Sequence, residues 1–318
     1  DWSSDVCSSD LEEEDILARV SMTKWAPILM RRMAETKRFC EVRLSKYVND
    51  ISDEEQSQFS VVCAALPDGS IYVAFSGTDD TIVGWRENFN MGFLAETPGQ
   101  LKAVRYLNRL DAPEGQKLRI GGHSKGGNLS VYAAVKCLPR LKGRILAVYS
   151  NDGPGFNREM IESEAYQEML PKIKTILPES SIIGMLLEHQ EDYEVVESSQ
   201  SGIQQHDAMS WEVLGPSFVY VEHVATKSIL LDETMKAWLY QLNQDERREI
   251  VDTVFFMLEE AKIRTVDDFY RSPWKKVQEL LRAKSRLPEE TQKLFSRAVK
   301  LLWTEGNKIG RASCRERV

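Results

Sequence analysis

The chain has 318 residues, of which 42% are hydrophobic, 28% are charged and 9% are aromatic, and its formal net charge is −8. These values exclude a disordered chain, a collagen-like repeat and a small disulfide scaffold. The excess of 49 Asp and Glu over 41 Lys and Arg argues against nucleic acid as a partner. No stretch reaches the roughly 18 uncharged apolar residues that a membrane span requires.

The two ends of the chain differ in character from the rest. Back-translation of DWSSDVCSSDL and IGRASCRERV matches a sequencing-library adaptor and its complement, so we expect residues 1–11 and 309–318 to be adaptor-derived and the native termini to be missing. The cysteines between them are Cys40, Cys63 and Cys137. They lack metal-type spacing and therefore favour reduced thiols and a cytoplasmic location.

In the first quarter of the chain we expect helices followed by a hairpin. Residues 13–45 mix charged and apolar side chains in a pattern typical of helices. Ser52 and Glu55 have the spacing of a capping box and predict a further short helix. The β-branched and aromatic runs at 59–66 and 71–77 flank a Pro-Asp-Gly turn, which predicts a β-hairpin.

Helices and strands are then expected to alternate. The pattern predicts a helix over 99–110, a strand over 118–123, a helix over 125–137 and strands over 144–150 and 172–177. Such alternation indicates a parallel, doubly wound sheet.

A change of character near residue 228 indicates a second region. We expect a core over residues 12–227 and an all-helical region over 228–308, in which apolar residues recur on one helical face from Ile250 onward. Asn243 and Asp245 are alternative caps for the helix that carries Ile250.

The segment with the clearest chemistry is a Gly-x-Ser-x-Gly motif formed by Gly122, Ser124 and Gly126, with His123 and Lys125 between them. It lies where a short apolar strand turns into a helix. A nucleophilic serine on such a sharp turn has a strained backbone, and glycines two residues on either side remove a collision. The alternative is a glycine-rich turn without chemistry.

This motif is part of a wider resemblance. Gly-His-Ser-Lys-Gly-Gly-Asn from Gly122, Phe-Ser-Gly-Thr ending at Thr78, Ser-Asn-Asp-Gly-Pro-Gly-Phe around Asp152 and Gln-His-Asp at 205–207 are similar to the Mbeg-like family. This bacterial family is related to class 3 lipases, and the resemblance covers about residues 40–225. It implies an α/β-hydrolase fold, with a mostly parallel central sheet flanked by helices, here with a helical C-terminal extension.

The base that would activate Ser124 must be one of four histidines. His123 adjoins the serine and is expected to point elsewhere. Because α/β-hydrolases order the triad as nucleophile, acid and histidine, His189, His206 and His223 remain. His206 lies in a polar, loop-like segment and is the expected base, with a structural histidine as the alternative.

The acid is expected to be Asp152, which follows the strand over 144–150. An aspartate there resembles the arrangement of pancreatic-type lipases, whereas class 3 lipases place it one strand later, where residues 177–182 hold none. Glu179 and Asp207 remain alternatives for the acid. The alternative role for Asp152 is to cap a turn without taking part in catalysis.

The oxyanion hole requires two main-chain donors. The amide of Lys125 is the first, and the similarity of residues 75–78 to a segment of class 3 lipases assigns Thr78 as the second, with a plain strand-end turn as the alternative. Residues 85–88 and 181–187 are candidates for the border of the acyl pocket. An apolar run like that at 181–187 is, however, more often part of the hydrophobic core.

Together these residues predict a cofactor-free and metal-free serine hydrolase of the lipase or esterase type. Ser124 is the nucleophile, His206 the base and Asp152 the acid, and the expected substrate is a small-molecule or lipid acyl ester. Peripheral membrane contact and the oligomeric state stay open. The alternatives are a non-catalytic binding or scaffold protein, and an acyltransferase or thioesterase that uses the same serine.

Overall fold

The computed structural model describes residues 25–52, 54–55, 57–78, 86–87, 90–91, 96–263 and 272–315. Its main strands are β1 (Arg43–Ser52), β2 (Ser57–Ala65), β3 (Ile71–Phe75), β4 (Leu118–His123), β5 (Ile145–Asn151), β6 (Ile173–Pro178), β7 (Tyr193–Val196), β8 (Val213–Leu214), β9 (Ser217–Phe218) and β10 (Tyr220–Val221). Its helices are α2 (Ala26–Ala34), α4 (Pro98–Asn108), α5 (Lys125–Lys136), α6 (Pro139–Lys142), α7 (Arg158–Ile161), α8 (Glu164–Met169), α9 (Thr226–Tyr240), α10 (Gln244–Glu260), α12 (Pro273–Ser285) and α13 (Glu289–Arg315), with 3₁₀ turns at η1 (Leu170–Lys172), η2 (Gly202–His206) and η3 (Ala208–Ser210).

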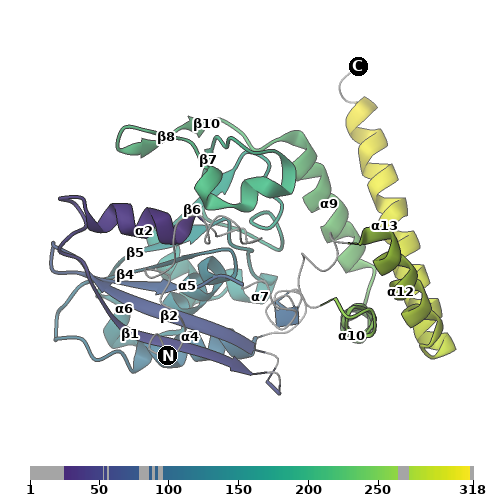
Figure 1. The fold of residues 1–318 in the computed structure, drawn as a ribbon, viewed down its shortest axis with the longest axis horizontal. Coiled ribbons are helices and arrows are strands. Elements are labelled where there is room, and N and C mark those ends of the chain that lie inside the picture. The colour runs from purple at the N-terminus through teal and green to yellow at the C-terminus, as the bar shows by residue number, and fades with distance from the viewer. Residues whose placement is uncertain are drawn as a thin grey trace.

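An eight-stranded sheet organises the first two thirds of the chain (Figure 1). Its order is β1-β2-β3-β4-β5-β6-β7-β10. The pairs from β3 to β7 are parallel, and the flanking pairs are antiparallel. This arrangement is the predicted α/β-hydrolase fold.

The expected double winding is wrong for the central strands. From β3 to β7 the spatial order follows the chain order without reversal. Right-handed crossovers between strands in that order place their helices on one face of the sheet. Accordingly, α5 packs on β3, β4 and β5 and is in contact with both α4 and α8.

The predicted hairpin is confirmed as β2 and β3, which pair from Val61 with Phe75 to Ala65 with Ile71. The Asp68 carboxylate accepts the Ser70 amide hydrogen at 2.9 Å and closes the turn.

The helix expected over 13–45 is correct where it covers α2 and wrong at its end. Residues 43–45 belong to β1, because main-chain pairing with β2 outweighs the helix propensity of arginine and leucine. The Glu55 amide does donate to the Ser52 hydroxyl at 3.1 Å, yet among the described residues this contact begins no helix. Strand β2 starts only two residues later, at Ser57.

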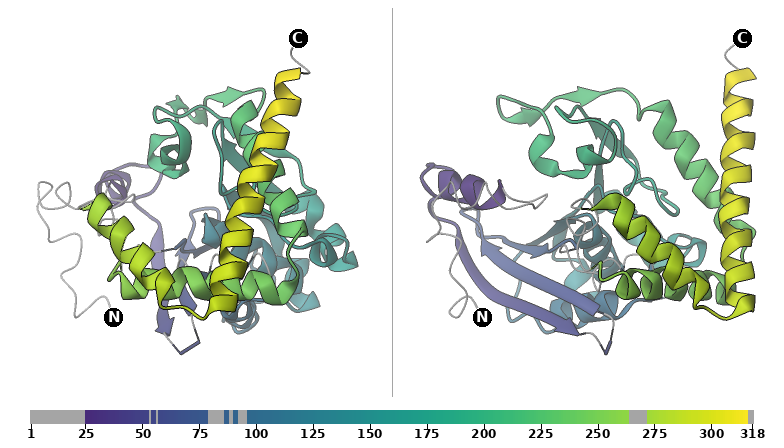
Figure 2. Two further views of the ribbon diagram at one scale, coloured as in Figure 1. Left: turned by 90° about the vertical axis from the view of Figure 1, so that its right-hand side faces the viewer. Right: turned by 45° about the vertical axis from the view of Figure 1, so that its right-hand side comes forward.

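The helices after residue 226 stand to one side of the sheet (Figure 2). Leu242, Ile250 and Ala298 form a small buried cluster, and Trp238 packs against it, so that the cluster joins α9, α10 and α13. Of the two predicted caps, Asn243 is the one that caps α10, accepting the Glu246 amide hydrogen at 2.9 Å.

Two further features bear on the ends and surface of the molecule. Helix α13 continues to Arg315, beyond the expected adaptor boundary at residue 309. Among the described helices, none combines the length and apolar character needed to cross a membrane.

Candidate active site

The Gly-x-Ser-x-Gly segment forms a strained turn between β4 and α5. Ser124 has φ 57° and ψ −127°, in the positive-φ region that residues with a side chain rarely adopt. A Cβ atom on Gly122 would lie 2.4 Å from the Phe75 carbonyl oxygen, and one on Gly126 would lie 2.2 Å from it. Glycine is therefore required on both sides of the serine because the turn packs directly on the end of β3.

The loop after β3 lies against this turn. A Cβ atom on Gly77 would lie 2.8 Å from the His123 carbonyl oxygen and 3.5 Å from the Ser124 Cβ. Thr78 is the next residue along the chain. The segment expected to carry the second oxyanion donor is thus beside the serine.

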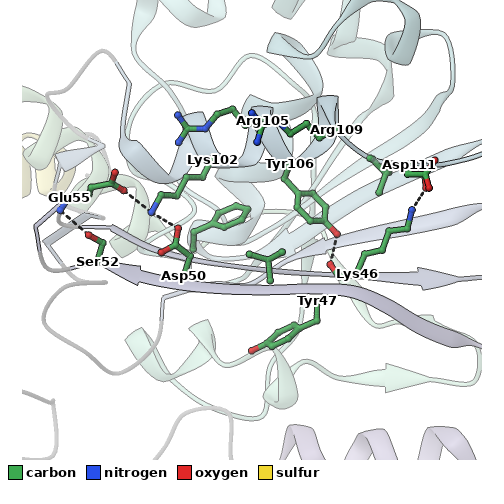
Figure 3. Close-up of a pocket in the computed structure, with 13 residues that line it drawn as sticks. Lys46, Tyr47, Asp50, Ser52, Glu55, Lys102, Arg105, Tyr106, Arg109 and Asp111 are labelled. Carbon is green, nitrogen blue, oxygen red and sulfur yellow. Dashed lines mark hydrogen bonds and ion pairs between the residues drawn. The ribbon is translucent and has the colours of Figure 1, made fainter. Parts of the chain in front are cut away.

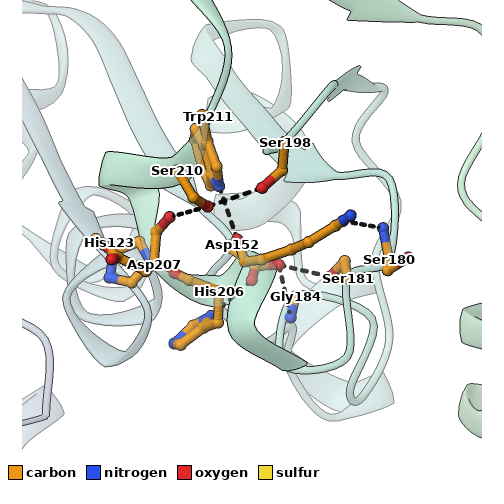
Figure 4. Close-up of polar contacts among 11 residues, drawn as sticks. His123, Asp152, Ser180, Ser181, Gly184, Ser198, His206, Asp207, Ser210 and Trp211 are labelled. Carbon is orange, nitrogen blue, oxygen red and sulfur yellow. Dashed lines mark hydrogen bonds and ion pairs between the residues drawn. The ribbon is translucent and has the colours of Figure 1, made fainter. Parts of the chain in front are cut away.

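A carboxylate and an imidazole meet next to the turn (Figure 4). The Asp152 Oδ2 and the His206 Nδ1 lie 2.6 Å apart. Asp152 is fully buried, and its Oδ1 accepts hydrogen bonds from the Ser181 hydroxyl at 2.5 Å and the Gly184 amide at 3.1 Å. Both carboxylate oxygens therefore have partners, which fixes the carboxylate and orients the imidazole.

Main-chain pairing holds the serine and the aspartate near each other. The Ser124 amide donates to the Asn151 carbonyl at 2.9 Å, and the Asp152 amide donates to the Ile176 carbonyl at 2.8 Å. Ser124 and Asp152 thus follow two adjacent parallel strands, β4 and β5, at the same edge of the sheet.

His206 lies at the end of η2, in the segment that connects β7 to β10. The buried Gln205 holds this segment against the residues after β6, since its side-chain oxygen accepts the Ser180 amide hydrogen at 2.6 Å. The Trp211 indole donates to the Gln205 carbonyl at 2.9 Å. These contacts determine where His206 lies, and the sequence pattern did not reveal them.

His123 supports His206 from the other side. Its Nε2 lies 2.7 Å from the His206 carbonyl oxygen, and the two rings are 4.5 Å apart between centroids. Burial, together with the charge of His206, lowers the pKa of His123 to about 4. His123 is therefore neutral near pH 7, and its Nε2–H donates to the carbonyl.

The other two histidines lie elsewhere. The His189 Nδ1 contacts the Glu191 carboxylate at 3.0 Å, and the His223 side chain is exposed beside Glu222. Among the described residues, His206 is the histidine that contacts Asp152.

The alternative acids have other surroundings. The Asp207 carboxylate accepts the Met209 amide hydrogen at 3.0 Å as the cap of a short turn, and Glu179 is exposed at the end of β6. The Asp152 carboxylate contacts the His206 imidazole directly, which supports Asp152 as the expected acid.

No hydrogen bond joins the Ser124 hydroxyl to the His206 imidazole within the described ranges. The two residues are linked instead through their neighbours, His123 and Asn151 on the serine side and Asp152 on the imidazole side. Contacts between nucleophile and base are often long without substrate and shorten when it binds.

The three described thiols, at Cys40, Cys63 and Cys137, are unpaired. Among the described residues, no group of three or more His, Cys, Asp or Glu side chains is placed to hold a metal ion.

A cleft between β1 and α4 lies away from these residues (Figure 3). It has a volume of about 800 Å³. Its most buried cation, Lys102, is paired with Asp50 and Glu55, each at 2.8 Å. None of the predicted catalytic or oxyanion-hole residues lines this cleft.

A mostly parallel sheet with a strained serine turn between strand and helix defines the α/β-hydrolase fold class. The Mbeg1-like family model matches residues 33–256, and the chain belongs to the Mbeg1-like family.

Among solved structures, a fungal lipase–inhibitor complex described as a model for interfacial activation is 14% identical, with a TM-score of 0.40, over 61% of this chain and 80% of that one. M37 lipase is 16% identical, with a TM-score of 0.39, over 55% of this chain and 70% of that one. A search of curated proteins finds no match.

Proposed function

We propose that this protein is a serine hydrolase of the lipase or esterase type, which cleaves a carboxylic ester through an acyl-enzyme intermediate. The observation that carries the proposal is the 2.6 Å contact between Asp152 and His206 beside the strained turn of Ser124.

In the proposed first step, the Ser124 hydroxyl attacks the ester carbonyl while the His206 Nε2 takes its proton. Asp152 holds the Nδ1 proton, which selects the required tautomer and stabilises the imidazolium. The alcohol leaves with the proton from His206. Water then attacks the acyl-serine by the same sequence and releases the acid.

The tetrahedral oxyanion would be held by the amides of Lys125 and Thr78. Lys125 opens helix α5, so that its amide lies at a helix N-terminus, where negative charge is stabilised. Each such donor contributes about 3–4 kcal/mol to the stability of the transition state.

The proposed substrate class is an acyl ester, whether a small molecule or a lipid. The resemblance to lipases in sequence motifs supports this class. The acyltransferase and thioesterase alternatives share the same residues and differ in the acceptor, so added alcohols or thiols would distinguish them by a change of product.

The test compares wild type with Ser124→Ala on short and long p-nitrophenyl esters and with a fluorophosphonate probe. We expect a loss of about 10⁶ in kcat and of all labelling, because the triad acts as a unit. Ser285→Ala, which removes a hydroxyl on α12, is the control and should leave both unchanged. Equal rates for wild type and Ser124→Ala would reject the proposal in favour of a non-catalytic protein.

A further inference from the structure

One residue beyond Ser124, a lysine side chain runs into the interior. Lys125 is 1% exposed. Its ammonium donates to the main-chain oxygen of Gln58 at 2.5 Å, to the Gln58 side-chain oxygen at 2.5 Å and to the Glu87 carboxylate at 2.9 Å. The ammonium is thus directed into the fold toward β2, and these contacts hold it there.

The partner carboxylate is also fully buried and joins several elements. Besides Lys125, Glu87 accepts the Gly99 amide hydrogen of α4 at 2.7 Å and the Gln58 amide hydrogen of β2 at 3.1 Å. A Cβ atom on Gly99 would lie 2.3 Å from this carboxylate. The packing of α4 therefore leaves space for the charged group.

Stability alone does not account for such a pair. Removing two charges from water costs several kcal/mol, and an apolar pair of similar volume is often as stable. The ion pair fixes the orientation of the Lys125 side chain, because the ammonium donates three hydrogen bonds to acceptors at fixed positions. Here those bonds attach the Lys125 side chain to Gln58 of β2 and, through Glu87, to Gly99 of α4, while the main chain of Lys125 directly follows Ser124 at the start of α5.

The residue before Glu87 points to a different part of the molecule. Arg86 pairs with Asp252 of α10 at 2.6 Å, and its guanidinium lies 5.8 Å from the centre of the Phe255 ring. Two consecutive residues thus link the lysine after the nucleophile to the C-terminal helices.

We propose that Glu87 is a positioning residue that, through the side chain of Lys125, holds the Lys125 amide in place for the oxyanion, and that Arg86 ties this arrangement to α10. The proposal rests on the proposed function, and it makes the helical region part of what shapes the active site.

The first test is Glu87→Gln in the full chain. The neutral side chain keeps the shape but leaves the lysine without its counter-charge, so the amide shifts. We expect kcat for a p-nitrophenyl ester and the rate of fluorophosphonate labelling to fall about 10- to 100-fold, as a displacement of about 1 Å at a reacting centre does. KM should change less than twofold, because the acyl-binding surface is untouched.

The double variant Glu87→Gln with Lys125→Met separates positioning from stability. It leaves no unpaired charge at this site, so its melting temperature should return toward that of wild type, while kcat stays at least 10-fold below that of wild type. If activity returned together with stability, the pair would be merely structural and the proposal would be overturned.

The link to α10 is tested with Asp252→Asn against Glu259→Gln. Both remove one negative charge from the same helix, but only Asp252 contacts Arg86. We expect the labelling rate to be two- to fivefold lower in Asp252→Asn and to be unchanged in Glu259→Gln. Equal rates in the two variants would contradict the link.

The outcomes distinguish this proposal from the one it rests on. Wild type that neither hydrolyses esters nor reacts with the probe would reject the proposed function and this inference with it. Labelled wild type with an equally labelled Glu87→Gln variant would reject only the positioning role.

Discussion

The sheet-based core and the C-terminal helical region differ in how densely their helices are packed. In the part that carries Ser124 and Asp152, residues 125–135 of α5 are all buried. In α12 of the helical part, Ala283 is the buried residue, and Trp274 is 83% exposed. Close main-chain packing therefore forms the candidate site, while the helical region contributes through a few specific contacts.

The difference extends to polar groups. In the core, Asn128 donates to the carbonyls of Pro154 and Gly155 and accepts from Gln100, which ties α5 to the loop after β5. In the helical region, pairs such as Arg286 with Glu260 lie at the surface, where each contributes at most about 1 kcal/mol. Substitutions in the two regions should therefore differ in kind.

Of the substitutions that compare the two regions, Asp152→Asn is expected to have the largest effect. Asparagine tolerates the positive φ of 48° at this position, so the fold should persist. Without the carboxylate the imidazole loses its orienting partner, and kcat should fall about 10³- to 10⁴-fold at an unchanged melting temperature. Steady-state kinetics with circular dichroism would check this, and full activity would move the acid to Glu179 or Asp207.

A smaller but still severe effect is expected for Gly126→Ala. The new methyl would lie 2.2 Å from the Phe75 carbonyl oxygen, which forces the turn away from β3. We expect a loss of about 3 kcal/mol in unfolding free energy from overpacking and a large loss of activity. Gly143→Ala is the matched control, because its methyl has no atom within 4 Å and its φ is −67°. Equal urea midpoints would show that the turn is not tightly packed.

The pH dependence of stability should report on a third buried carboxylate, that of Glu191. Burial would raise the pKa of Glu191, but hydrogen bonds from His189 and Tyr166 and the charge of His189 lower it to about 2. A carboxyl group with a lowered pKa stabilises the fold above its unfolded value of 4.5, and this contribution is lost as pH falls toward 2. At 1.36 kcal/mol per unit, the difference amounts to about 3 kcal/mol.

Glu191→Gln should therefore lower stability at pH 7 and flatten its decline between pH 4.5 and 2, as measured by urea unfolding. Glu162→Gln, which breaks an exposed pair with Arg158, should change it by less than about 0.5 kcal/mol. A decline that stays as steep in Glu191→Gln would assign the acid sensitivity to other groups.

The smallest effect is expected in the helical region. Asn243→Ala removes the cap of α10 and should cost about 1 kcal/mol. Hydrogen exchange should report the loss in α10 while strands β4 and β5 keep their protection. If the strands lost protection equally, the two regions would unfold as one unit, and the comparison above would not hold.

Much of this protein follows from local sequence. The β2–β3 hairpin and the strand–turn–helix at Ser124 depend on residues near one another in the chain and are predicted from sequence, while the cap of α10 is narrowed by sequence to Asn243 or Asp245. The end of the expected helix over 13–45 was not, because β1 exists only through pairing with β2.

The sequence by itself determined the turn around Ser124, since glycine spacing and strand–helix alternation are local properties. Only the tertiary structure decided which carboxylate meets His206, that Ser181 and Gly184 support it, and that Lys125 is paired with Glu87. These partners lie 29 to 54 positions apart for the Asp152 contacts and 38 for the lysine pair. Contacts over such separations depend on how strands and helices pack, which no short pattern records.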